Sequence, residues 1–149
     1  MVPFHRAERS LAAGLLELLH SSQERLPSFA GVDWDKALGW LRRRTGQDLA
    51  SGQHEAVKLA LTRKVAVLTG GPGCGKSFTV RSVVELATAK QATVMLVAPT
   101  GRAAKRLAEL TGQEAFTVHG LLELQPGGEP KYDATTLCTP IWSSPTRPR

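Results

Sequence analysis

The sequence predicts an α/β fold in which a helical N-terminal region precedes a parallel sheet. A short β-branched run at 64–69 leads through a glycine-rich turn into a helical pattern, and a second apolar run follows at 93–98. A strand–helix–strand unit of this kind joins parallel strands by a right-handed crossover. Apolar residues at helical spacing before residue 46 predict the helical region.

The glycine-rich turn has the pattern G-x-x-x-x-G-K-[ST] of a phosphate-binding loop. A helix N-terminus carries about half a positive charge and unpaired N–H groups, which attract an anion. Glycines permit positive φ and leave room for a phosphate, so that successive N–H groups can point inward. The alternative is a glycine-rich turn without a ligand. The loop consists of Gly70, Gly71, Pro72, Gly73, Cys74, Gly75, Lys76 and Ser77.

Two side chains at the end of this loop carry the expected chemistry. Lys76 would neutralise the β- and γ-phosphates, and the Ser77 hydroxyl would be a ligand of Mg²⁺. We therefore predict Lys76 and Ser77 as the catalytic residues, Ser77 as the metal ligand, and ATP with Mg²⁺ as the cofactors.

Composition limits the class of protein. The 149 residues suffice for about one domain, 42% of them are hydrophobic, and the net charge of +6 suits a polyanionic partner. Cys74 and Cys138 form no disulfide or metal pattern, which is typical of a reduced cytosolic chain. Because the sequence has neither a long apolar run nor a signal peptide, we expect a soluble cytoplasmic protein without a membrane partner.

Three helices are expected before the loop. The first lies within 4–26 and ends before Pro27, and Asp33 can cap a second that ends at Gly46. The third begins near Ser51. The run Arg42–Arg44 is either a favourable ending of the second helix or a contact with a phosphate backbone.

A cationic segment follows the second strand, where ligands bind in open α/β sheets. Thr100 and Gly101 open a helix whose N–H groups could hold a phosphate, and an ordinary cationic helix is the alternative. The cations at helical spacing are Arg102, Lys105 and Arg106. Thr117 could cap a further short helix, in which His119 is expected to pack or cap rather than catalyse.

Four segments of the chain form a recognisable series: Gln53–Val57, Leu68–Ser77, Ala98–Leu107 and Thr117–Leu122. Together they resemble the RecD-like branch of superfamily 1 DNA helicases. The resemblance covers about residues 47–124 closely and the earlier helices more weakly. It implies a RecA-like P-loop NTPase sheet and ATP hydrolysis coupled to 5′-to-3′ unwinding of DNA.

The resemblance also implies roles for single residues. Gln53 would match the family's adenine-reading glutamine, and the loop with Phe78 would hold the nucleotide. Cys74 replaces the usual threonine, which is tolerable where mainly the backbone N–H contributes, and Gly120 replaces an arginine whose contact is lost. The residues that would touch single-stranded DNA are Pro99, Thr100, Gly101, Arg102 and Lys105.

We expect a helical region at 1–46, a partial motor domain at 47–132 and a tail at 133–149. The family's acidic D-E-A-S motif, which holds Mg²⁺ and activates water, is absent after the K-Y-D region. Residues 135–149 have no periodicity and no acid, as in a disordered tail. A shifted reading frame over 141–149 permits Leu-Val-Val-Ala-Asp-Glu-Ala-Ser, which predicts a frameshift near Asp133. A natural short protein is the alternative.

The sequence thus predicts the N-terminal part of an ATP-dependent DNA helicase, truncated and inactive by itself. Its expected partner is single-stranded or duplex DNA, and no protein partner can be named. Two alternatives stay open: an inert nucleotide- or DNA-binding fragment, and another P-loop ATPase of clamp-loader type. The segment Ala98–Leu107 argues against the second.

Overall fold

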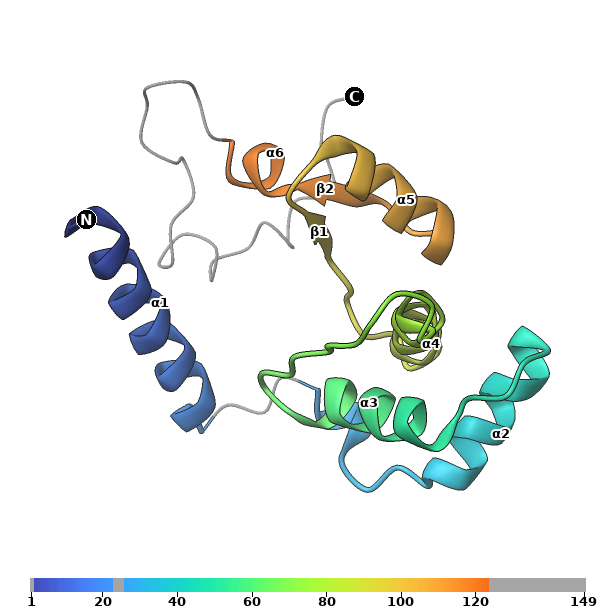
Figure 1. Cartoon of the computed structure of the whole chain (residues 1–149). Helices are drawn as coiled ribbons and strands as arrows, with labels where there is room; N and C mark the ends of the chain where they lie inside the picture. The colour runs from blue at the N-terminus through green and yellow to red at the C-terminus, as the bar shows by residue number, and fades with distance from the viewer. Residues whose placement is uncertain (1, 23–25, 124–149) are drawn as a thin grey trace. The chain divides into compact units, whose positions relative to one another are not determined.

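A computed structural model describes residues 2–22 and 26–123 of the chain. The chain separates into two compact units, Met1–Val94 and Met95–Arg149, and each is considered by itself (Figure 1). The expected domains at 1–46, 47–132 and 133–149 stay a prediction. The two compact units reflect how the residues pack and do not define where a motor domain begins or ends. The predicted tail and frameshift at 133–149 lie outside the described residues.

The first helix, α1, runs over Val2–His20, so an N-terminal helix is present as predicted, but it begins before residue 4 and ends well before Pro27. Its apolar side chains are largely exposed, with Leu11 at 65% and Leu19 at 51%. His20 closes the last turn, where its Nδ1 lies 2.7 Å from the carbonyl oxygen of Leu16. Along the described residues, no helix is both long and apolar enough to cross a membrane.

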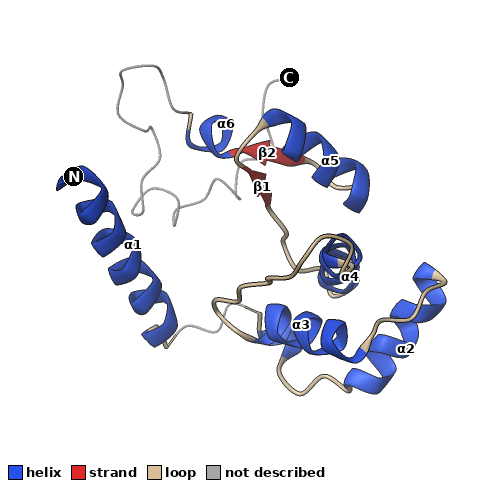
Figure 2. Ribbon diagram, in the orientation of Figure 1, coloured by secondary structure: helices blue, strands red, loops and turns tan. Residues whose placement is uncertain are grey.

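Three further helices form the core of the first unit: α2 (Trp34–Thr45), α3 (Ser51–Thr62) and α4 (Lys76–Ala89). α4 contacts both α2 and α3, and the 3-10 turn η1 (Pro27–Phe29) completes the unit (Figure 2). The ring of Phe29 stacks on Trp34 with centroids 6.3 Å apart. The buried core residues are Phe29, Leu41, Leu49, Val57, Leu61, Leu86 and Ala87.

Both ends of α2 confirm their predicted caps. Asp33 accepts a hydrogen bond from the Lys36 backbone N–H at 3.1 Å, which satisfies one of the unpaired donors at a helix start. Gly46 takes the left-handed conformation with φ of 70°, and its N–H donates to the carbonyl of Arg42. These local signals determine where α2 begins and ends.

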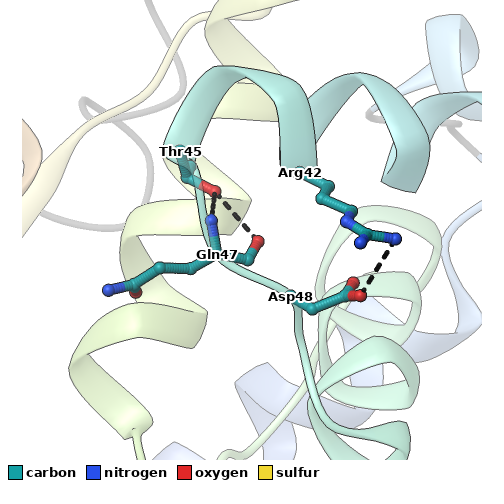
Figure 3. Close-up of polar contacts among 4 residues, drawn as sticks. All are labelled: Arg42, Thr45, Gln47 and Asp48. Atoms are coloured by element: carbon teal, nitrogen blue, oxygen red, sulfur yellow. Dashed lines mark hydrogen bonds and ion pairs between the residues drawn. The ribbon is translucent and has the colours of Figure 1, made fainter.

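The arginines at the end of α2 form ion pairs within the unit. Arg42 lies 3.3 Å from Asp48 across the turn that follows the helix, beside the bonds between Thr45 and Gln47 (Figure 3). Arg44 Nε donates to Glu85 of α4 at 3.4 Å. Two of the three arginines therefore stabilise the end of α2, which favours the first of the two interpretations of this run.

The strand predicted at 64–69 is not formed, and this expectation is wrong for the described residues. These residues carry no strand assignment, and Val67 is 83% exposed. A strand is held by hydrogen bonds to a neighbouring strand, and no described segment pairs with this one. The apolar, β-branched pattern alone did not suffice to form it.

The second unit contains the sheet. Strand β1 (Leu96–Ala98) pairs in parallel with β2 (Ala115–Thr117), with Leu96 opposite Ala115 and Ala98 opposite Thr117. Helix α5 (Gly101–Thr111) connects them, and α6 (Val118–Leu122) follows. A strand–helix–strand unit is therefore present, but it consists of β1, α5 and β2 and not of the predicted strand at 64–69, the helix after the loop and the strand at 93–98. The expected strand at 93–98 shortens to its last three residues, and β2 was not predicted.

Candidate nucleotide site

The phosphate loop turns directly into α4, and two of its glycines require the conformation that only glycine adopts readily. Gly73 has φ of 75° and Gly75 has φ of 77°, both left-handed. Gly70 is needed for space instead, because a Cβ there would lie 2.5 Å from the Cys74 sulfur. All four loop glycines permit positive φ, and these two adopt it.

The Lys76 ammonium folds back into the loop. Its Nζ donates to the carbonyl oxygens of Gly70 and Gly71, each at 2.6 Å, and lies 3.4 Å from Sγ of Cys74. Short bonds from a charged donor are the strong class of hydrogen bond. Two loop carbonyls therefore hold a positive charge next to the N-terminus of α4, which also favours an anion.

The residues after Lys76 differ in their surroundings. Ser77 is exposed, and no hydrogen bond of its hydroxyl is seen among the described residues. Thr79 is buried, and its hydroxyl donates to the carbonyl of Gly75 at 3.2 Å, which ties the first turn of α4 to the loop. Phe78, predicted to touch the nucleotide, is half-buried against the core of the unit.

Gln53 reaches the loop from α3. Its Oε1 accepts from the backbone N–H of Ala50 at 2.9 Å, and its Nε2 donates to the carbonyl oxygen of Cys74 at 3.3 Å. The structure thus brings the predicted adenine-reading residue onto the phosphate loop itself. The sequence carries a weak signal for half of this arrangement, since Ala50-x-x-Gln53 has the glutamine of a capping box.

Few side chains near the phosphate loop could bind a divalent metal ion. Among residues 2–22 and 26–123, no three His, Cys, Asp or Glu side chains gather at a possible metal site. Mg²⁺ in nucleotide sites is ordinarily held by few protein groups together with phosphates and water. The free hydroxyl of Ser77 fits one such position, provided that phosphates supply others.

The predicted DNA-contacting segment belongs to the second unit. The Thr100 hydroxyl caps α5 by accepting from the Ala103 N–H at 3.3 Å, and Gly112 ends the helix with φ of 69°. Arg102, Lys105 and Arg106 are exposed, and no ion pair holds them within the described part of the chain. This leaves three cations near the start of one helix.

The short helix α6 confirms its predicted cap. The Thr117 hydroxyl accepts from the Gly120 N–H at 3.0 Å. His119 is exposed and therefore does not pack in a core, whereas Leu121 is buried.

The AAA domain family matches residues 53–140, which is more than half of the chain. The chain is also 38% identical over 126 residues to the ATP-dependent RecD2 DNA helicase of Deinococcus radiodurans. It belongs to the AAA domain family. The match includes Gln53, the phosphate loop and the start of α5, so the resemblance noted in the sequence is confirmed.

Two other relatives are also similar to this chain over half of its length or more. It is 37% identical over 155 residues to the RecBCD enzyme subunit RecD of Mycobacterium tuberculosis, and 34% identical over 88 residues to the ATP-dependent DNA helicase dda of Enterobacteria phage T4. The three alignments cover 83%, 87% and 55% of this chain but 16%, 24% and 20% of the respective relatives. The chain therefore spans less than a quarter of the length of these relatives.

Proposed function

We propose that this chain provides the ATP site and a single-stranded DNA contact of a helicase that couples ATP hydrolysis to 5′-to-3′ unwinding. The observation that carries the proposal is the loop, in which left-handed Gly73 and Gly75 precede α4 and the Lys76 ammonium donates to two loop carbonyls. The resemblance to RecD-like helicases supports the coupling to DNA, because the relatives of this chain include proteins named as ATP-dependent DNA helicases.

The loop residues would divide the work of holding a triphosphate. The loop N–H groups and the N-terminus of α4 would neutralise part of the charge, and Lys76 would exchange the carbonyls of Gly70 and Gly71 for phosphate oxygens. Bound Mg²⁺ would neutralise charge that develops during phosphoryl transfer. Ser77 would hold the ion through its free hydroxyl.

DNA would be held by the second unit. Arg102 and Lys105 lie in the first two turns of α5, close to N–H groups that the Thr100 cap leaves unpaired. Contacts of this kind go to phosphates, so they supply affinity without reading sequence. We assign Pro99 and Gly101 to the same contact, because they lie between the end of β1 at Ala98 and the start of α5.

Nucleotide binding is the activity that this chain can be tested for directly. Isothermal titration of the 149-residue chain with ATP and Mg²⁺ should show binding that Lys76→Ala weakens. Bonds from a charged donor are worth about 1.5–3 kcal/mol, which corresponds to roughly 10- to 100-fold in affinity. Lys90→Ala is the matched control, because Lys90 follows the far end of the same helix. Equal affinities of the Lys76→Ala variant and the unsubstituted chain would refute the assignment.

A further inference from the structure

The side-chain amide of Gln53 joins two elements that the nucleotide site needs. Its oxygen accepts from the Ala50 N–H at the start of α3, and its nitrogen donates to the Cys74 carbonyl inside the loop. The two bonds define the orientation of the amide, because the opposite orientation would set N–H against N–H and oxygen against oxygen. Gln53 is half-buried, so the amide is partly shielded from water.

The same amide lies against the backbone of the next residue. A Cβ added at Gly75 would collide with Nε2 of Gln53, whereas a Cβ at Gly73 would meet nothing within 4 Å. The amide therefore lies against the side of the loop where the chain takes its last left-handed step before α4. No other described side chain is recorded in that space.

A loop that points its N–H groups at an anion must direct carbonyls elsewhere, and these carbonyls need partners of their own. The Lys76 ammonium donates hydrogen bonds to the carbonyls of Gly70 and Gly71 at the start of the loop. The Gln53 amide donates a hydrogen bond to the carbonyl of Cys74 near the end of the loop. When a phosphate draws the Lys76 ammonium away, the Gln53 bond can persist, because it lies on the Cys74 carbonyl and not on the ammonium.

We propose that Gln53 is a positioning residue that holds the Cys74–Gly75 turn in its anion-binding shape, so that it strengthens phosphate binding even without a base. The inference rests on the proposed nucleotide site and adds to the adenine contact that the resemblance implies. Each polar atom of the amide keeps one further bonding position, so a base can be bound at the same time.

The first test removes the base from the ligand. Inorganic tripolyphosphate with Mg²⁺ is titrated calorimetrically into the 149-residue chain and its Gln53→Ala variant, with ATP in parallel. Tripolyphosphate affinity should fall about 3- to 10-fold, the range expected for one lost hydrogen bond. Gln47→Ala is the control, since Gln47 is an exposed glutamine of the same unit that bonds to Thr45 through its backbone N–H and carbonyl.

The outcomes distinguish a failure of the positioning role of Gln53 from a failure of the proposed nucleotide site. If Gln53→Ala weakens ATP but leaves tripolyphosphate unchanged, Gln53 only reads the base, and the positioning role is refuted while the nucleotide site stands. If the unsubstituted chain binds neither ligand, the proposed nucleotide site fails and the inference fails with it.

A second variant tests the contact without any ligand. In Gln53→Glu, the carboxylate can still accept from the Ala50 N–H but cannot donate to the Cys74 carbonyl. Amide hydrogen exchange should therefore rise in a peptide over residues 70–78 and stay unchanged at the start of α3 and the end of α4. Unchanged exchange over 70–78, or a rise of equal size throughout the unit, would overturn the proposal.

Discussion

Single glycine-to-alanine substitutions at three positions of the phosphate loop should change the free energy of unfolding by different amounts, because the three positions differ in conformation and space. Gly71 lacks a positive φ, and a Cβ there would meet nothing within 4 Å. Gly73 has positive φ and the same open space. Gly75 has positive φ, and its space is filled by the Gln53 amide.

The magnitudes follow from these differences. Gly71→Ala should be neutral or slightly stabilising, because the unfolded chain loses freedom that the folded loop does not use. Gly73→Ala should cost about 1–2 kcal/mol, the penalty of a left-handed backbone for an L-residue. Gly75→Ala should cost about 1 kcal/mol more, because the new Cβ displaces Gln53 from the Cys74 carbonyl.

Urea unfolding of the 149-residue chain, followed by helical circular dichroism, measures these free energies. In a Gln53→Ala background the space beside Gly75 is empty, so the cost of Gly75→Ala should fall to that of Gly73→Ala. Equal costs of the two substitutions in the unsubstituted chain would refute the steric part of the reasoning. A Gly73→Ala variant as stable as the unsubstituted chain would refute the conformational part.

Three further results are expected. Arg102→Ala with Lys105→Ala should weaken single-strand binding equally for all base compositions and flatten the slope of log K against log salt by about 0.7 per lost contact; fluorescence anisotropy measures this, and an unchanged slope would contradict it. Ser77→Ala should weaken triphosphate binding with Mg²⁺ but not with EDTA in calorimetric titrations, because its exposed hydroxyl is proposed to bind only the ion; equal weakening in both would exclude a metal ligand. Hydrogen bonds from the Lys36 N–H and ammonium hold the pKa of Asp33 below its ordinary value, so its stabilising effect is present above the unfolded pKa and is lost as the pH falls through the folded one. Unfolding midpoints at about pH 6 and about pH 2.5 should therefore differ less in Asp33→Asn than in the unsubstituted chain, and an equal difference would contradict this.

The helix boundaries were predictable because their signals are local. Asp33 and Thr100 cap the N–H groups of residues three positions away, and Gly46 and Gly112 provide the left-handed step that ends a helix. None of these interactions requires a distant segment. The phosphate loop was predictable for the same reason, since its pattern is continuous in the sequence.

The strands were predicted less well. Residues 64–69 have the composition of a buried strand, yet they remain unpaired among the described residues, and Val67 stays exposed. Ala115–Thr117 is too short to give a pattern, yet it forms a strand because β1 lies beside it in register. Whether a strand forms depends on hydrogen bonds to a neighbour, which composition does not specify.

The sequence by itself determined the phosphate loop, the ends of α2 and α5, and the resemblance of this chain to RecD-like helicases. Only the tertiary structure decided what the Lys76 ammonium contacts and which distant residues meet. It places Lys76 on two loop carbonyls, Gln53 on the Cys74 carbonyl and Arg44 on Glu85. Gln53 and Cys74 are 21 positions apart, and Arg44 and Glu85 are 41 apart. Contacts over such separations arise only when packed helices bring the residues together, which local sequence patterns do not encode.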